Sequence, residues 1–338
     1  MILRRLAPAV QPLLSVVGAF VIAGVVVWAC GGSPLEALTA LVQGSCGSST
    51  GLLRTLSKAT PLLLSGLAVA VALRAGLFNI GAEGQLILGA LAAAWAGHAF
   101  TGLPAWIHIP VCLAAGVFVG ALWAAIPGAL RAWRGSHEVI VTIMLNYLAI
   151  QLAHFLVNGA MKDPVSMAPA TSMVEPSARL WAAADGSNFS AGFGLAVLAA
   201  VGVAVLLRHT ALGFEIRAVG LGADAARVAG VNVGRTMISA MAISGGLAGL
   251  AGAIEVLGVH RRYLDAFSPG YGFDSIAVAL LGGGGALGVT LSSLLFGGLS
   301  AGATHMEAWT HVPRQIAGIV QGVVIFSAGA RYLKGRRR

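Results

Sequence analysis

Charged residues are scarce in this chain of 338 residues. Asp, Glu, Lys and Arg together make up 10% of it, whereas hydrophobic residues make up 57%. A soluble domain usually has about 25% charged residues, so this composition excludes an ordinary soluble fold. Aromatic residues are few as well, at 7%. Because nucleic-acid binding needs a contiguous basic face with stacking aromatic rings, the net charge of +9 does not indicate a nucleic-acid partner.

Lysine and cysteine are rarer still, which excludes several kinds of site. The chain has three lysines, and none of them follows a glycine, so it contains no Walker A sequence for binding ATP. Its three cysteines, Cys30, Cys46 and Cys112, match neither a metal-ligand spacing nor a disulfide framework, and we expect unpaired thiols, with a bridge between Cys30 and Cys46 as the alternative. The HExxH pattern is also absent. The sequence therefore predicts a protein that is not an enzyme, with no cofactor and no metal site in this chain.

What the chain does contain is a series of charge-free apolar runs. A run of about 20 residues crosses a hydrocarbon layer of about 30 Å. The predicted spans are Leu13–Cys30, Ala59–Leu73, Gln85–Phe100, Trp106–Leu130, Val139–Val157, Phe189–Leu207, Thr236–Val256, Phe273–Leu281, Ala286–Ala303 and Ile316–Ala330. The span Phe273–Leu281 is too short to cross alone and predicts a broken helix. We expect an all-α integral membrane protein with about ten transmembrane helices, some of them broken, in one domain over residues 1–338.

The arginines predict the orientation of these spans. They gather at helix ends: Arg4 and Arg5; Arg131 and Arg134; Arg208, Arg217, Arg227 and Arg235; and the basic residues from Arg331 to Arg338. Since basic residues mark cytoplasmic loops, both termini and the loop 208–235 are predicted to be cytoplasmic. The polar stretch 159–188 has no basic excess and is predicted to be external. The segment 31–57, rich in Gly and Ser, is expected to be an outer connection with one short helix in Pro34–Gln43.

Glycines at small-xxx-small spacing predict close helix packing, because small residues let helices approach one another in lipid. The pairs are Gly245 with Gly249, Gly298 with Gly302, and Gly318 with Gly322.

Two interruptions of the apolar pattern are candidates for a solute pathway. Gly76–Gln85 places Asn79, Glu83 and Gln85 among glycines, and irregular backbone at membrane depth occurs where it lines a cavity. The alternative is a tight cytoplasmic turn in which Glu83 pairs with Arg74. In the second half, Asp274 precedes the short apolar segment and is a pathway candidate too. Its alternative role is to cap the helix that follows.

Polar residues also recur along one face of the span 139–157. Tyr147, Gln151, His154 and Asn158 are spaced 4, 3 and 4 apart, which puts them within a stripe of about 60°, with Asn146 at its edge. Polar groups do not face lipid without a free-energy penalty. We therefore expect this stripe to face either a neighbouring helix or a wet pathway.

The cytoplasmic loop predicts a short surface helix. Asp224 is placed to cap a helix that runs through Ala229 and is ended by Gly230. Such a small, smooth helix is suited to a groove on a partner protein.

Five stretches of the chain resemble a known family, the permease subunits of ATP-binding-cassette importers for simple sugars and nucleosides. They are Ala59–Leu67, Gly76–Gln85, Glu138–Tyr147, Gly213–Val231 and Gly270–Gly282. The resemblance implies a permease that pairs with a second copy or a sister permease, receives solute from an external binding protein, and is driven by a cytoplasmic ATPase that binds ATP and Mg²⁺. It also implies the plasma (inner) membrane of a bacterium.

The resemblance assigns two further roles. It identifies the segment 222–230 with the helix that couples the permease to the ATPase: Gly222, Ala223, Asp224, Ala225, Ala226, Arg227 and Gly230. The sequence of Phe78–Gln85 is similar to that of the nucleoside-importing branch of the family, which favours nucleosides over pentose sugars as the solute.

Two other classes of function are weighed against this resemblance. An ion-coupled secondary transporter is expected to carry ionisable residues deep in its spans, and only Glu255, Glu83 and Asp274 qualify. An enzyme embedded in the membrane is expected to show a clustered metal or acid–base set, and the sequence shows none.

Overall fold

The computed structural model describes residues 17–29, 31–183, 187–310, 312, 313, 315, 316, 318–320, 322 and 323. Helices make up most of this part. The labelled helices are α2 (Pro34–Cys46), α3 (Ser49–Arg74), α4 (Ala82–Ala99), α5 (Ala105–Arg134), α6 (Glu138–Asn158), α7 (Gly192–His209), α8 (Ala211–Leu221), α9 (Ala223–Val228), α10 (Val233–Ile254), α11 (Tyr271–Leu281) and α12 (Ala286–Thr310). A 3₁₀ turn covers Pro176–Ala178, and a π-helix, Glu255–His260, continues α10.

Within the described residues, β pairing is limited to two isolated bridges, which confirms the all-α class. Six helices are long and apolar enough to cross a membrane: α3, α5, α6, α7, α12, and α10 together with its π-helical extension. A shorter apolar helix covers Val17–Ala29. The remaining parts of the first and last predicted spans, the basic tail and Cys30 lie outside the described residues, so the number of ten spans stays a prediction.

Two helix starts differ from the sequence prediction. Helix α3 begins at Ser49, about ten residues before the predicted span, because the Ser48 side chain accepts the Gly51 amide and caps it. The predicted outer connection is therefore largely helical, with α2 in the place of the expected short helix. Helix α4 begins at Ala82, so Glu83 and Gln85 lie in its first turn and not in the preceding interruption.

Helix α10 is the centre of the bundle, packed against α3, α4 and α5. Its small residues make this possible: a Cβ on Gly249 would lie 2.2 Å from the Gly116 carbonyl oxygen, and one on Gly245 would lie 2.2 Å from that of Gly120. The predicted packing role of this glycine pair is confirmed. Gly302 approaches Leu41 of α2 as closely, whereas Gly298 makes only ordinary contacts.

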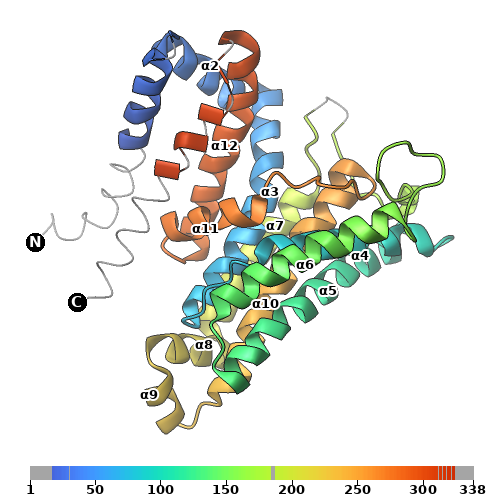
Figure 1. The fold of residues 1–338 in the computed structure, drawn as a ribbon, viewed down its shortest axis with the longest axis vertical. Coiled ribbons are helices and arrows are strands. Elements are labelled where there is room, and N and C mark those ends of the chain that lie inside the picture. The colour runs from blue at the N-terminus through green and yellow to red at the C-terminus, as the bar shows by residue number, and fades with distance from the viewer. Residues whose placement is uncertain are drawn as a thin grey trace, which may run out of the picture.

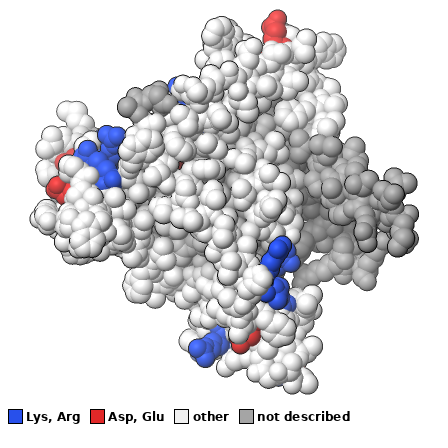
Figure 2. Space-filling model, turned by 180° about the vertical axis from the view of Figure 1, so that it is seen from behind, with Lys and Arg blue, Asp and Glu red and all other residues white. Residues whose placement is uncertain are grey.

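The molecule has two distinct ends (Figure 1). The short helices α8 and α9 project from the lower end, beside the junction of α5 and α6, and the loops between α6 and α7 lie at the opposite end. Figure 2 shows Lys, Arg, Asp and Glu in a few small groups near the edges of one face, with a broad uncharged area between them. An uncharged belt between charged ends is what a bilayer requires.

Candidate functional site

A polar cavity of about 360 Å³ opens between α4, α6 and the turn that joins the π-helix to α11. This size is in the range of about 300 to 1,000 Å³ typical of small-molecule sites. Its functional groups are two carboxylates, an amide, an imidazole, two hydroxyls and two aromatic rings, from Glu83, Gln151, His154, Tyr263, Asp265, Phe267 and Ser268. We call this space the α6 cavity. Three of these residues, Glu83, Gln151 and His154, are pathway candidates from the sequence.

A short contact closes one side of the α6 cavity. The Nδ1 atom of His154 on α6 lies 2.6 Å from Oδ2 of Asp265 in the turn. A contact of this length between an imidazole and a carboxylate is a strong hydrogen bond. It joins α6 to the turn at residues 111 positions apart in the sequence, so it fixes the turn over the cavity.

Glu83 lies where the N-terminal ends of two helices meet. It stands in the first turn of α4 and is 3% exposed, and its Oε2 atom accepts the Gly272 amide at the start of α11, at 2.6 Å. A carboxylate is favoured at a helix N-terminus because the backbone amides there have no intrahelical partner. The Ser268 side chain also hydrogen-bonds this carboxylate, and Glu83 borders the cavity.

The contact between the N-terminal ends of α4 and α11 excludes the alternative in which Glu83 lies in a tight turn and pairs with Arg74. Arg74 donates to the carbonyl oxygens of Gly283 and Gly284 and does not pair with Glu83. These glycines follow the last residue of α11, whereas Gly272 belongs to its first turn. A helix of 11 residues is about 16 Å long. The chain therefore returns into the bundle between Arg74 and Ala82, as a re-entrant segment does.

The turn over the α6 cavity has unusual backbone. It follows a π-helix, and π-helical turns are frequent at functional sites. Two non-glycine residues in it, Arg261 and Ala266, have positive φ angles of 59° and 53°. Such conformations raise the free energy of the folded state and are found where the surroundings impose them.

Here the surroundings are the loop between α6 and α7. The Thr171 and Val174 amides donate to carbonyl oxygens of Tyr263 and Arg261, at 3.0 and 2.9 Å. The predicted external stretch is therefore bonded to the turn that covers the cavity.

Three sequence candidates are buried behind the cavity and hold the re-entrant segment. Asn79, Gln85 and Asn146 are at most 2% exposed. Asn79 Nδ2 donates to Gln85 Oε1 at 2.9 Å and to Ser244 Oγ at 2.8 Å. Asn146 accepts the Gly84 amide at 2.8 Å and donates to the Ile80 carbonyl at 2.9 Å. These side chains satisfy the backbone of an irregular segment that water cannot reach.

The other members of the predicted set lie at the rim or elsewhere. Tyr147 and Asn158 share the exposed polar face of α6 with Gln151 and His154, and Asn158 donates to the His154 carbonyl at 2.8 Å. Asp274 is half-buried inside the first turn of α11 and does not line the α6 cavity. The alternative that Asp274 caps the helix is wrong, because Gly270 occupies the N-cap position. The φ of Gly270 is 106°, in the left-handed region that favours glycine.

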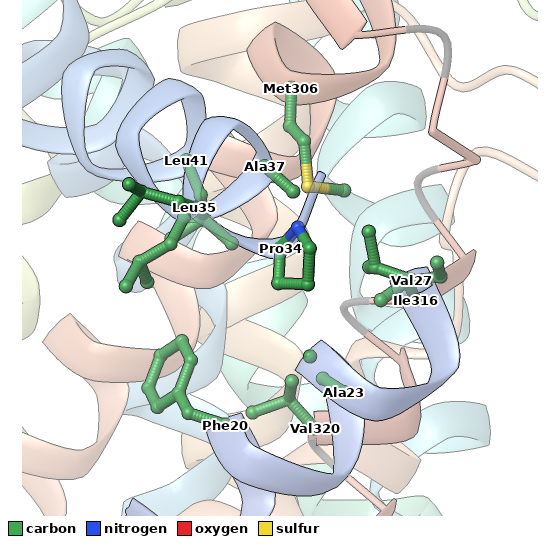
Figure 3. A pocket seen from close by; sticks show the side chains of 12 residues that line it. Phe20, Ala23, Val27, Pro34, Leu35, Ala37, Leu41, Met306, Ile316 and Val320 are labelled. Carbon is green, nitrogen blue, oxygen red and sulfur yellow. The ribbon is translucent and has the colours of Figure 1, made fainter. Parts of the chain in front are cut away.

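A second pocket differs from the α6 cavity because only apolar residues line it. It measures about 310 Å³ and lies between the helix Val17–Ala29, α2 and α12 (Figure 3). The side chains of Phe20, Val27, Leu35 and Met306 that surround it carry no oxygen and no nitrogen. Without hydrogen-bonding side chains it has no means of selecting a polar solute.

The predicted surface helix is α9, and the structure changes two details of it. Gly222, not Asp224, occupies the N-cap, while Asp224 pairs with Arg227 at 3.4 Å within the helix. Ala226 is 4% exposed and packs against Val219 and Val233, so it supports the helix from beneath. The outward apolar side chains are Leu221 and Val228, which are 92% and 91% exposed. Gly230, with φ of 86°, ends the segment.

Sequence reasoning missed four residues of the α6 cavity: Tyr263, Asp265, Phe267 and Ser268. They lie in an irregular turn with no helical period, and they meet α6 only through the fold. One indication was available, since Asp265 is an acidic residue in a turn between two apolar segments. Among the described residues, no group of three or more His, Cys, Asp or Glu side chains is placed to hold a metal ion.

Comparison with known proteins identifies the family. A family model described as branched-chain amino acid transport system / permease component matches residues 51–329. A guanosine ABC transporter permease of Bacillus subtilis, NupP, is 40% identical over 97% of this chain and 95% of its own length. A nucleoside ABC transporter permease of Lactococcus lactis, NupB, is 34% identical over 95% of this chain and 91% of its own length.

A glucose ABC transporter permease of Haloferax volcanii is 37% identical over 95% of this chain and 88% of its own length. These matches run over nearly the whole chain, and the described part contains six helices able to cross a bilayer. The chain therefore belongs to the branched-chain amino acid transport system / permease component family, as a multi-pass integral membrane permease subunit of an ATP-binding-cassette importer.

Proposed function

We propose that this chain imports nucleosides and that the solute passes through the α6 cavity. One observation carries the proposal: in an apolar helical bundle, two carboxylates, an amide and an imidazole meet two aromatic rings around one cavity. Carboxylate and amide groups accept hydrogen bonds from ribose hydroxyls. Aromatic faces such as those of Tyr263 and Phe267 stack on nucleobases. Relatives named for guanosine and nucleosides support the same solute class.

Simple sugars are the second candidate. A relative named for glucose is 37% identical to this chain, and hydroxyl-binding groups alone would suffice for a sugar. The aromatic rings favour a nucleoside, because a sugar ring offers no π-face to them.

The proposed topology has ten spans, with both termini, α8 and α9 in the cytoplasm and residues 159–188 outside. Arginines at the α9 end and on the C-terminal tail support this orientation. We place the protein in the plasma (inner) membrane of a bacterium.

The proposed partners follow from this arrangement. A separate cytoplasmic ATPase, which binds ATP and Mg²⁺, docks on α9. A solute-binding protein delivers the nucleoside to the outer end, and a second copy or a sister permease covers the exposed polar face of α6. Tyr147 is 64% exposed on that face. Polar side chains there would be unfavourable against lipid, which supports a protein or a wet pathway beside it.

Competition for uptake tests the proposal. The complete transporter is reconstituted in vesicles with ATP, and uptake of labelled guanosine is measured with an excess of unlabelled guanosine, uridine, ribose, xylose or glucose. We expect the nucleosides to suppress uptake and the sugars to leave it unchanged. Uptake of a labelled sugar that nucleosides do not suppress would overturn the nucleoside assignment in favour of a sugar permease.

A further inference from the structure

A second polar cavity, of about 320 Å³, lies between α3, the π-helix and the loop that precedes α7. The function proposed above does not use it. Its walls include Ser57 and Lys58 of α3, Glu255 and His260 of the π-helix, Asn188, and Tyr271 of α11. The segment 255–271 separates this space from the α6 cavity, since its residues line both. We call the second space the α3 chamber.

The carboxylate of Glu255 is the unusual group in the α3 chamber. The residue is 4% exposed, yet no described residue donates a hydrogen bond to it. Its nearest basic neighbour is His260, with Nε2 at 3.7 Å from Oε2, which is too long for a hydrogen bond. Buried carboxylates are normally hydrogen-bonded, and one without donors is unfavourable. Glu255 therefore presents two acceptor oxygens to the space that it borders.

The other groups restrict what these oxygens can receive. Lys58 lines the same chamber and donates to the Tyr271 hydroxyl at 3.2 Å, and Arg54 stands at the chamber wall as well. The positive charges of Lys58 and Arg54 repel a metal ion, which would also need several oxygen ligands. The Glu255 carboxylate repels an anion. A neutral solute with adjacent N–H or O–H donors satisfies the acceptor pair without an added charge.

We propose that the α3 chamber is a second solute site, in which Glu255 receives a pair of adjacent hydrogen-bond donors from a neutral solute. This inference rests on the proposed function, because it concerns the same class of solute. Two parts of a nucleoside have the required chemistry: the vicinal hydroxyls of ribose, and the N–H edge of a base such as guanine. Lys58 is then available to a carbonyl oxygen of the same solute.

The primary test is solute affinity of the complete transporter without ATP, measured by calorimetry in lipid nanodiscs with guanosine. Glu255→Gln keeps the size of the side chain and removes one acceptor. We expect the Kd for guanosine to rise by roughly ten- to hundredfold, the usual effect of losing a hydrogen bond to a charged group. The matched control is Glu36→Gln, the same change at an exposed position of α2, and its Kd should equal that of the unchanged protein.

The source of the donors is resolved with two further probes, 2′-deoxyguanosine, which lacks the vicinal diol, and 1-methylguanosine, which lacks the N1–H donor of the base edge. If the ribose diol binds Glu255, 1-methylguanosine competes with guanosine and 2′-deoxyguanosine does not. If the base edge binds, 2′-deoxyguanosine competes and 1-methylguanosine does not. Either result supports the chamber, provided that Glu255→Gln weakens competition by the active probe. An equal Kd in Glu255→Gln and unchanged protein overturns it.

A second measurement covers the case in which Glu255→Gln does not assemble. Ser57→Cys is introduced into a chain whose native cysteines are replaced by alanine, and the rate of its modification by a thiol reagent is followed. Guanosine should slow the modification at least about fivefold if solute occupies the chamber. No protection, in a transporter that still takes up guanosine, overturns the chamber and leaves the proposed function standing. Absence of guanosine uptake in the unchanged transporter overturns both.

Discussion

Polar side chains in the interior of this bundle have two different roles. Asn79, Gln85 and Asn146 bind neighbouring side chains or the backbone and are at most 2% exposed. Glu83, Gln151 and His154 border a cavity. The sequence places all six among the same candidates, because a polar residue in an apolar run gives the same pattern in both roles. Only the contacts of each side chain show whether its role is structural or lies in the solute site.

Asn79→Ala should lower stability without changing solute preference. It removes the side chain that bonds Gln85 and Ser244 and leaves both without this partner. The expected loss in the free energy of unfolding is roughly 1 to 3 kcal/mol, as is usual for buried groups that lose their partners. Denaturation of the purified protein measures it. Asn158→Ala, on the exposed face of α6, is the control, and equal stability of the two variants would exclude a structural role for Asn79.

The sequence predicted the helices and the contacts between them better than it predicted the turns. Apolar runs identified most of the spans, and the spacing of Gly245 and Gly249 identified the face of α10 that meets α5. The turn 261–270, the start of α4 and the cap of α11 were not predictable. They depend on bonds such as Gly272 to Glu83 and His154 to Asp265, between residues far apart in the chain.

Gly249→Leu should prevent the close contact of α10 with α5. The first added carbon would lie 2.2 Å from the Gly116 carbonyl oxygen, so the two backbones must separate. Gly202→Leu on α7 is a matched control, since a Cβ there meets no atom within 4 Å. We expect the first variant to lose most of its detergent-stable protein in size-exclusion chromatography and the second to keep it. Similar yields would contradict the packing assigned to this glycine pair.

Helix α9 offers a test of coupling to the ATPase. Ala226 is among the coupling residues that the resemblance assigns, but its side chain is buried beneath the helix, and a bulky charge there would displace α9 itself. Val228→Asp is the sharper change, because the side chain is 91% exposed. We expect it to reduce transport about tenfold or more, through loss of an apolar contact with the partner.

Val165→Asp is the control for this change, as an equivalent substitution on a side chain that is 90% exposed at the other end of the molecule. Both proteins should insert in the membrane at normal levels. ATP-dependent uptake and ATPase activity are then measured on the assembled transporter. Uptake by Val228→Asp equal to that of the control would show that α9 does not dock on the ATPase.

At the scale of the whole molecule, three features belong together: a helical bundle with a broad uncharged area on one face, a polar cavity that opens beside α6, and the loop between α6 and α7, which is bonded to the turn above that cavity. The bonds from Thr171 and Val174 to the turn would connect the proposed binding protein, docked on this loop, to the cavity. Composition predicted the membrane class, and the resemblance of five sequence stretches to a known family predicted the permease. The cavity itself required the fold, because α4, α6 and the turn supply its walls from three separate parts of the chain.

Water access to the α6 cavity tests this account most directly. A cysteine replaces Gln151, which lines the cavity, or Leu198 on α7, an apolar side chain that is 67% exposed and that we expect to face lipid, in a chain free of other cysteines. Intact membranes are treated with a water-soluble, membrane-impermeant thiol reagent, with and without guanosine. The account predicts rapid modification at Gln151→Cys, slowed by guanosine, and little at Leu198→Cys. Equal protection of the two positions from the reagent would contradict a wet solute pathway at this face of α6.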